Sequence, residues 1–258
     1  MIRHLAGNLS LLRGGSGALL VLLHPLALAG QLWRPLAAKL DGFDILAVDL
    51  RGHGESPWDG KPFSIEDMAD DLGVTLDVLG LDEISLLGMS MGGSVAMTFA
   101  GKYPERVRSL VLADTTAWYG ENAPTAWAQR AAKAADTARA DQLPFQLDRW
   151  FSPGFRESHP DEVDRVCEIF LHTDSHAHAA ASVAMGELDA RPLLFSVRAK
   201  TLVLAGEHDY ATPPSMAGEL AGAIPGATLE ILPALRHLSL VEKPELAETI
   251  HRHLTETA

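Results

Sequence analysis

The chain has 258 residues, of which 47% are hydrophobic and 21% charged, and this composition predicts an ordered globular core. Its 34 acidic and 21 basic residues give a net charge of −13, which repels phosphate backbones and anionic lipid surfaces and so argues against nucleic-acid and membrane binding. Cys167 is the only cysteine, which excludes an internal disulfide and favours a reducing, cytoplasmic location.

Short apolar runs recur along the chain, each of the length and character of a buried parallel strand. They cover residues 18–23, 45–48, 84–87, 110–113, 201–205 and 228–232. Amphipathic helices are expected between them. Ser64 and Asp67 form a capping-box pattern that opens a helix to about Leu79, and two further helices are expected over 91–102 and 244–254. This alternation predicts an α/β fold with a mostly parallel sheet that is covered by helices on both faces.

The alternation stops between about residues 116 and 195. This segment is rich in alanine, contains several aromatic residues and has no good strand candidate. Because the strand pattern resumes at Thr201, the segment is interpreted as a helical cap over the sheet. The core would then comprise residues 1–115 and 196–258, and the cap residues 116–195.

The most informative motif lies after the third of these strands. Gly88-Met-Ser90-Met-Gly92 matches G-x-S-x-G, with a strand pattern before it and a helical pattern after it. A strand that turns directly into a helix leaves no room for side chains at Gly88 and Gly92, and it exposes the serine hydroxyl at the carboxyl edge of the sheet. Ser90 is therefore the predicted nucleophile.

At this point the sequence resembles the α/β-hydrolase family over nearly its whole length. Besides the serine motif, the resemblance rests on Asp49-Leu-Arg-Gly-His53-Gly-Glu-Ser56, which follows the second predicted strand like the common loop of that family. The resemblance implies an α/β-hydrolase fold with a helical cap. It also implies that His53 is structural, since the family keeps this histidine away from the nucleophile.

A serine nucleophile needs a base and an acid that orients the base, and in this fold they follow in the order Ser, Asp, His. His237 follows the last predicted strand in a stretch that resembles the family's catalytic histidine loop, whereas His251 and His253 are expected to be solvated on the terminal helix. Asp209 follows the strand at 201–205 and is the preferred acid.

Asp114, at the end of the strand at 110–113, is the rival acid, although a helix-capping role would also explain it. Glu207 and His208 are interpreted as loop residues beside the acid.

The first strand and the loop after it, residues 17–30, also resemble a secretory signal peptide with a cleavage site after Ala29. Cleavage would remove a strand of the sheet, and the preceding residues carry only Arg3 as a firm positive charge, so we interpret the segment as a strand and a functional loop. Pro25 has no N–H group, and therefore the backbone amides of Leu26 and Met91 are the predicted oxyanion hole. Such a site needs no metal and no organic cofactor.

Two weaker patterns in the cap have ordinary explanations. His172, His176 and His178 resemble a metal site, but they have no second ligand cluster, so exposed helix histidines explain them, and substrate contact is more plausible than metal binding. Cys167 is interpreted as a packing residue.

Within the family, the sequence is most similar to 3-oxoadipate enol-lactonases and related small ester hydrolases. Five stretches carry this resemblance: residues 88–93, 103–112, 149–153, 205–214 and 237–242. It implies a small-molecule ester or lactone with a free carboxylate, for which Arg130 is the candidate cation and Trp127 and Trp150 are candidate pocket residues. The sequence His24-Pro25 departs from the family's usual form, so the substrate stays open.

Three alternatives to lactone or ester hydrolysis remain: a carbon–carbon bond hydrolase, a cofactor-free perhydrolase, and a small-molecule receptor or signalling protein on the same fold. The first two would use the same triad, and such receptors often retain it.

Overall fold

A computed structural model describes residues 1–256 and contains one eight-stranded sheet with the order β1-β2-β4-β3-β5-β6-β7-β8. β1 and β2 pair antiparallel with each other, and β2 pairs antiparallel with β4; all other neighbours are parallel. The strands are β1 (Ile2–Ala6), β2 (Leu9–Gly15), β3 (Ala18–Leu23), β4 (Phe43–Val48), β5 (Ile84–Met89), β6 (Val107–Ala113), β7 (Lys200–Gly206) and β8 (Thr228–Leu232).

All six predicted strands are present, and β3 and β8 have the predicted bounds. The two N-terminal strands were not predicted. β1 lies at the edge of the sheet and exposes four of its five residues, so it lacks the continuous apolar run of a buried strand. The apolar part of β2 is interrupted by Arg13, so β2 also lacks a continuous apolar run; Arg13 forms an ion pair with Asp44 of β4.

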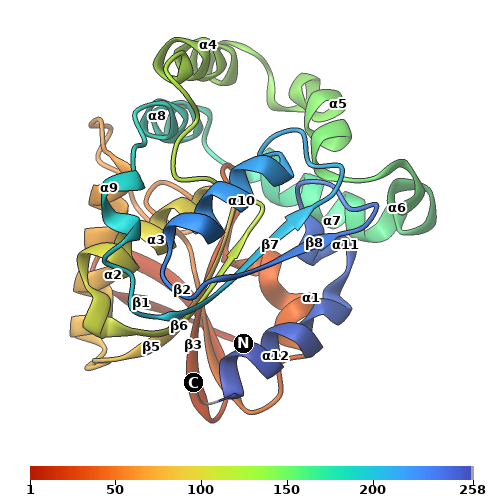
Figure 1. The fold of residues 1–258 in the computed structure, drawn as a ribbon. Helices are drawn as coiled ribbons and strands as arrows, with labels where there is room; N and C mark the ends of the chain where they lie inside the picture. Colours follow the sequence, from red (N-terminus) through yellow and green to blue (C-terminus); the bar gives the residue numbers. More distant parts are fainter. Residues whose placement is uncertain (257–258) are drawn as a thin grey trace.

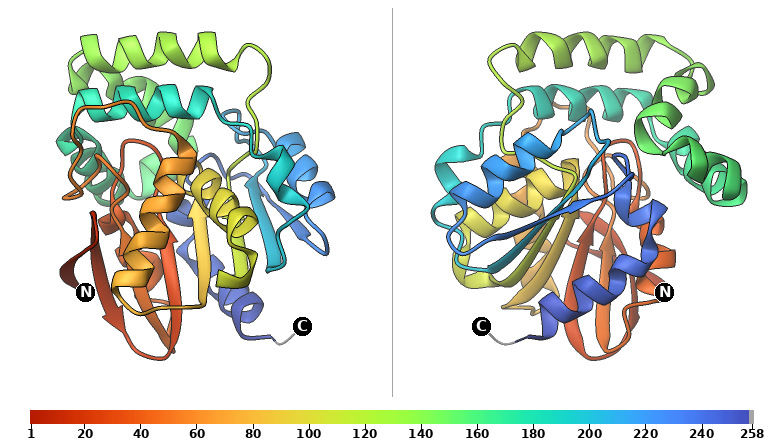
Figure 2. Two further views of the ribbon diagram at one scale, coloured as in Figure 1. Left: turned by 90° about the vertical axis from the view of Figure 1, so that its left-hand side faces the viewer. Right: turned by 45° about the vertical axis from the view of Figure 1, so that its right-hand side comes forward.

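Helices cover both faces of the sheet, as Figures 1 and 2 show. α2 (Ile65–Val78), α3 (Met91–Lys102) and α10 (Pro214–Ala223) pack on one face, and α1 (Arg34–Ala37), α11 (Ser239–Glu242) and α12 (Ala247–Thr255) on the other. Each face of the sheet has its own hydrophobic core, and β3 contributes to both. Val21 and Leu23 pack in the first core, under α2, α3 and α10, and Leu20 and Leu22 pack in the second core, under α1, α11 and α12. This two-sided burial explains why the central strands are apolar runs without alternation.

The segment between β6 and β7 is helical, as expected. It contains α4 (Ala123–Asp136), α5 (Arg139–Trp150), α6 (Pro153–Ser158), α7 (Pro160–His172), α8 (Ser175–Gly186) and the short α9 (Arg191–Leu194). In Figure 2, α4 and α8 run side by side above the carboxyl ends of the strands. The division of the chain into a core and a cap stays a prediction.

The C-terminal helix differs from the expectation in one respect. It begins as a 3-10 turn over Pro244–Leu246 before α12, and α12 packs against β6. His253 is therefore buried, with Nε2 3.2 Å from the carbonyl oxygen of Leu110 and 3.1 Å from that of Lys200. The prediction that His253 is solvated was wrong. His251 is half-buried, and its ring meets the edge of Phe43.

Within residues 1–256, no helix combines the length and apolar character that crossing a membrane requires.

Candidate active site

Ser90 stands on the sharp turn between β5 and α3. Its backbone angles, φ 55° and ψ −120°, lie in a region that L-residues rarely adopt. The neighbouring glycines permit the turn, because a Cβ atom at Gly88 would lie 2.2 Å from the carbonyl oxygen of Gly92, and one at Gly92 would lie 2.2 Å from that of Leu23. Both obstacles are backbone atoms that cannot move aside. The predicted serine turn is thus present with the predicted spatial reason for its glycines.

The structure brings Ser90, His237 and Asp209 into one hydrogen-bonded chain. The Oγ of Ser90 lies 2.8 Å from Nε2 of His237, and Nδ1 of His237 lies 2.7 Å from Oδ2 of Asp209. All three residues are buried. The loop around Asp209 holds the carboxylate, since Oδ1 accepts from the amides of Ala211 and Thr212 and Oδ2 accepts from the Thr212 hydroxyl. These bonds leave Oδ2 directed at the imidazole.

The two candidate acids occupy different electrostatic environments. Burial opposes ionisation of Asp209, but the charge and hydrogen bonds of His237 and Thr212 outweigh it and lower the pKa of Asp209. Asp114 does not contact the histidine; it accepts from the amide of Gly206 and from the amide and hydroxyl of Ser239. Complete burial and then the negative charge of Asp209 raise the pKa of Asp114 well above its usual value. These opposite pKa shifts indicate that Asp209 is ionised and Asp114 is neutral.

Asp114 stabilises the loop that carries the histidine. Ser239, which it binds through two hydrogen bonds, is the first residue of α11 and lies two positions after His237. The capping role that the sequence suggested for Asp114 therefore concerns this later helix.

The two backbone amides of the predicted oxyanion hole have no protein acceptor among residues 1–256. Met91 is the first residue of α3, where an N–H has no intrahelical partner, and Leu26 follows β3 in the loop toward α1. Among residues 1–256, neither amide donates a hydrogen bond to another protein group. His24 fixes this loop: its Nε2 accepts the amide of Leu50, so Nδ1 carries the proton and donates to the carbonyl of Pro25.

A small cavity of about 20 Å³ surrounds the serine. That space holds about one water molecule, so a larger ligand needs the side chains that line it to move. The predicted pocket residues Trp127, Arg130 and Trp150 line it together with Ser90 and His237. The remaining lining residues are Pro25, Leu26, Gln146, Arg149 and His178.

Two arginines in this cavity lack acidic partners. Within the described residues, neither Arg130 nor Arg149 forms an ion pair or a side-chain hydrogen bond. Burial, followed by the positive charge of Arg149, lowers the pKa of Arg130 to about 9, and burial likewise lowers the pKa of Arg149. The guanidinium of Arg130 stacks on Trp127, 4.2 Å from the ring centroid. Two unpaired, half-buried cations are costly to the fold and favour an anionic ligand.

Sequence reasoning did not single out Arg149 as a pocket residue, although it noted the stretch 149–153. That stretch contacts the histidine loop. Glu242 accepts from the amide of Ser152 at 3.0 Å and from its hydroxyl at 2.5 Å, and it also accepts from the amide of Arg236. The amide of Leu238 donates to the carbonyl of Trp150. Two stretches far apart in the sequence thus meet beside His237.

The three cap histidines do not form a metal site. His172 ends α7, whereas His176 and His178 belong to α8, so the first two do not share one helix as their spacing suggested. His172 and His176 are exposed, but His178 is 3% exposed and lines the cavity, so the prediction that all three are exposed was wrong for His178. No group of three potential ligands that could hold a metal ion is found in the described part of the chain.

Three other residues have the structural environment that the sequence suggested. Cys167 packs in the second core, where burial raises the pKa of its thiol. His53 is buried outside the serine cavity, with Nδ1 donating to the carbonyl of Arg51. Glu207 accepts the amide of Ala234 at the surface.

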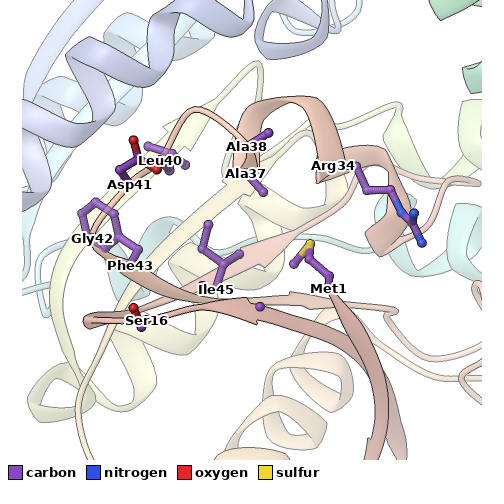
Figure 3. A pocket seen from close by; sticks show the side chains of 12 residues that line it. Met1, Ser16, Arg34, Ala37, Ala38, Leu40, Asp41, Gly42, Phe43 and Ile45 are labelled. Atoms are coloured by element: carbon purple, nitrogen blue, oxygen red, sulfur yellow. The ribbon is translucent and has the colours of Figure 1, made fainter.

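A larger cavity, of about 480 Å³, lies at the opposite end of the strands (Figure 3). It is bounded by the end of β2, the start of β4 and α1, and Arg34 and Asp41 are its charged residues. It contains none of the predicted site residues. Cavity size alone therefore does not identify the candidate site; the hydrogen-bonded serine, histidine and aspartate lie at the carboxyl edge of the sheet.

Comparison with known proteins agrees with this fold. A family model described as the alpha/beta hydrolase fold matches residues 18–244. 3-Oxoadipate enol-lactonase 2 of Acinetobacter baylyi is 31% identical over 216 residues, which are 83% of this chain and 80% of that protein. The solved enol-lactonase of Burkholderia xenovorans has a TM-score of 0.91 and 29% identity, and the match covers 99% of this chain and 100% of that one. A thermophilic esterase of Thermogutta terrifontis, solved with malate bound, has a TM-score of 0.90, 30% identity and 98% coverage of both chains.

Proposed function

This chain belongs to the alpha/beta hydrolase family, and on that premise we propose that it is a serine hydrolase that opens a small carboxylate-bearing lactone or ester through an acyl-enzyme. One observation carries the proposal: Ser90 and His237 of the hydrogen-bonded chain line the same cavity as two arginines that have no acidic partner within residues 1–256. Lactonase and esterase relatives support the reaction type.

In the first step, Ser90 Oγ attacks the carbonyl carbon while His237 Nε2 takes its proton. Asp209 fixes the imidazole with its proton on Nδ1 and stabilises the positive charge that the ring acquires. The carbonyl oxygen becomes an oxyanion, which the amides of Leu26 and Met91 would hold; a donor in this role contributes about 2.7–4 kcal/mol to transition-state stabilisation.

The tetrahedral intermediate collapses when the bond to the ring or alcohol oxygen breaks, and His237 gives its proton to that oxygen. In a lactone the leaving oxygen stays attached to the acyl chain. Water then attacks the ester on Ser90, His237 takes a proton from the water, and the serine leaves with that proton. These steps consume one water and release one acid.

The substrate class follows from the donors around the serine. Arg130 and Arg149 supply positive charge, and a substrate carboxylate would compensate the cost of burying them. The related esterase was solved with malate bound, and malate is a dicarboxylate, which supports an anionic ligand for a protein of this fold. Arg130 stacks on Trp127, which holds the guanidinium in place for a bidentate contact.

The test is a kinetic panel of matched substrate pairs: a γ-lactone with an acetate side chain against its ethyl analogue, and 4-nitrophenyl hydrogen succinate against 4-nitrophenyl butanoate. The proposal predicts a kcat/KM at least about tenfold higher for each carboxylate, since a hydrogen bond to a charged group contributes about 1.5–3 kcal/mol. Arg130→Met should remove most of that preference. Arg198→Met, at an exposed position before β7, is the matched control and should preserve it.

The reaction type is tested separately. Ser90→Ala should abolish the burst of 4-nitrophenol while retaining the wild-type circular dichroism spectrum. Equal rates for the carboxylated and neutral substrates would contradict the proposed preference for a substrate carboxylate and would indicate a general esterase. Turnover of a vinylogous diketone in preference to all lactones would indicate the carbon–carbon bond hydrolase instead.

A further inference from the structure

His178 is the histidine of the serine cavity that the reaction steps do not use. It lies on α8, is 3% exposed, and lines the cavity with Ser90 and His237. Its Nδ1 lies 2.7 Å from Nη1 of Arg139. A guanidinium can only donate hydrogen bonds, so Nδ1 must accept, and the ring proton of His178 therefore resides on Nε2.

Arg139 is held firmly in this position. Its Nε and Nη2 donate to the carbonyl oxygen of Phe170 at 3.2 and 2.5 Å, and its guanidinium carbon lies 3.6 Å from the centroid of the Phe170 ring. Burial lowers the pKa of Arg139 to about 10, which leaves it a cation at neutral pH. The guanidinium group of Arg139 thus links the end of α7 to the ring of His178.

Burial and the nearby arginines oppose the protonation of His178. Burial, followed by the charge of Arg139 on α5 and the influence of His53 after β4 and Arg130 on α4, lowers the pKa of His178 well below its usual value. The ring is consequently a neutral imidazole of fixed tautomer.

The Nε2–H group of this ring has no acceptor among residues 1–256. Its histidine neighbour does not satisfy it, because Nε2 of His53 has no hydrogen-bond partner in that part of the chain. The rest of the cavity wall mainly adds donors: two arginines, the amide group of Gln146 and the free amide of Leu26. A ligand in this cavity must therefore bring acceptor oxygens.

We propose that His178 is a specificity-determining residue whose Nε2–H donates a hydrogen bond to the substrate carboxylate, and that Arg139 is the positioning residue that fixes its tautomer. Arg130 lines both this cavity and an outer one of about 280 Å³ between α4 and α5, and His178 does the same, so the two side chains can take the two oxygens of one carboxylate. The inference rests on the proposed hydrolase function for its substrate.

The experiment compares His178→Leu, which removes the donor, with His178→Gln, whose amide N–H can replace it. For 4-nitrophenyl hydrogen succinate, His178→Leu should raise KM about 10–100-fold, the range for a lost hydrogen bond to a charged group, while KM for 4-nitrophenyl butanoate stays within about twofold. His178→Gln should recover most of the loss. His176→Gln, an exposed histidine on the same helix, is the control and should change neither.

Two readouts do not depend on turnover. Glutarate binding, measured by calorimetry in the Ser90→Ala protein, should weaken at least about tenfold when His178→Leu is added. In ¹⁵N NMR spectra at pH 7, His178 of the wild type should be the neutral Nε2–H tautomer, and Arg139→Met, which removes the donor to Nδ1, should let the Nδ1–H tautomer appear.

Equal effects of His178→Leu on the charged and neutral esters would overturn the specificity role. An Nδ1–H tautomer in the wild type, or an imidazolium at pH 7, would overturn the role of Arg139. Undiminished turnover by Ser90→Ala would instead refute the proposed hydrolase mechanism, and glutarate binding would still decide the role of His178.

Discussion

Replacing Arg130 by methionine should stabilise the protein while weakening its binding of carboxylates. Burial and the neighbouring Arg149 lower the pKa of Arg130 from its ordinary value above about 12 to about 9. A difference of about three pH units, at about 1.4 kcal/mol each, corresponds to about 4 kcal/mol of folding free energy lost by keeping this cation charged. Loss of the stacking on Trp127 offsets about 1–2 kcal/mol of the gain.

The expected net gain for Arg130→Met is therefore about 2–3 kcal/mol, or a rise in Tm of about 5–10 °C for a chain of this size. The sign of the pH dependence follows from a lowered pKa on a base. Below pH 9 the arginine is charged in both the folded and unfolded states, so its full cost is present; the cost decreases as the pH rises through 9. The stability difference between wild type and variant should be constant from pH 6 to 8 and smaller at pH 10.

Urea unfolding and thermal scans with and without glutarate test this reasoning. Glutarate should raise the Tm of the wild type by binding the folded state and raise that of Arg130→Met much less. Arg198→Met is the control at an exposed site and should leave stability within about 0.5 kcal/mol. A destabilised Arg130→Met, or an equal glutarate effect on both proteins, would refute the idea of an uncompensated cation in the pocket.

Other predictions concern the acid, the turn and the first long helix. Asp209→Asn should lower kcat by about 10⁴, whereas Asp114→Asn should keep it within a few-fold because that carboxyl is already neutral; comparable losses would remove the distinction between them. Gly92→Ala should lower the yield of soluble protein sharply, since its Cβ would lie 2.2 Å from a carbonyl oxygen, and a normal yield with unchanged Tm would contradict that geometry. Ser64→Ala should cost about 1 kcal/mol in urea unfolding through loss of the α2 cap, and no change would show that the capping box contributes nothing.

Local sequence patterns predict much of the fold. A parallel strand buried on both faces needs an apolar run, and all six such runs became strands. The Ser64 capping box and the glycines of the serine turn act within a few residues of themselves, so their consequences were predictable. The N-terminal strands β1 and β2 were missed, because they pair antiparallel, β1 at the exposed edge of the sheet, and such pairing needs no continuous apolar run.

The amino-acid sequence by itself determined the six apolar strands and the serine turn, since each depends on neighbouring residues, and the resemblance to the family supplied the succession Ser, Asp, His. Tertiary structure decided the charge state and exposure of the polar groups. Asp114 lies beside Asp209, His178 accepts from Arg139, and Arg130 lies near Arg149, in each case across 19 to 95 positions of the chain. Burial and charge act through space, so a side chain's partner, and with it the proton it carries, is set by the fold that brings distant residues together.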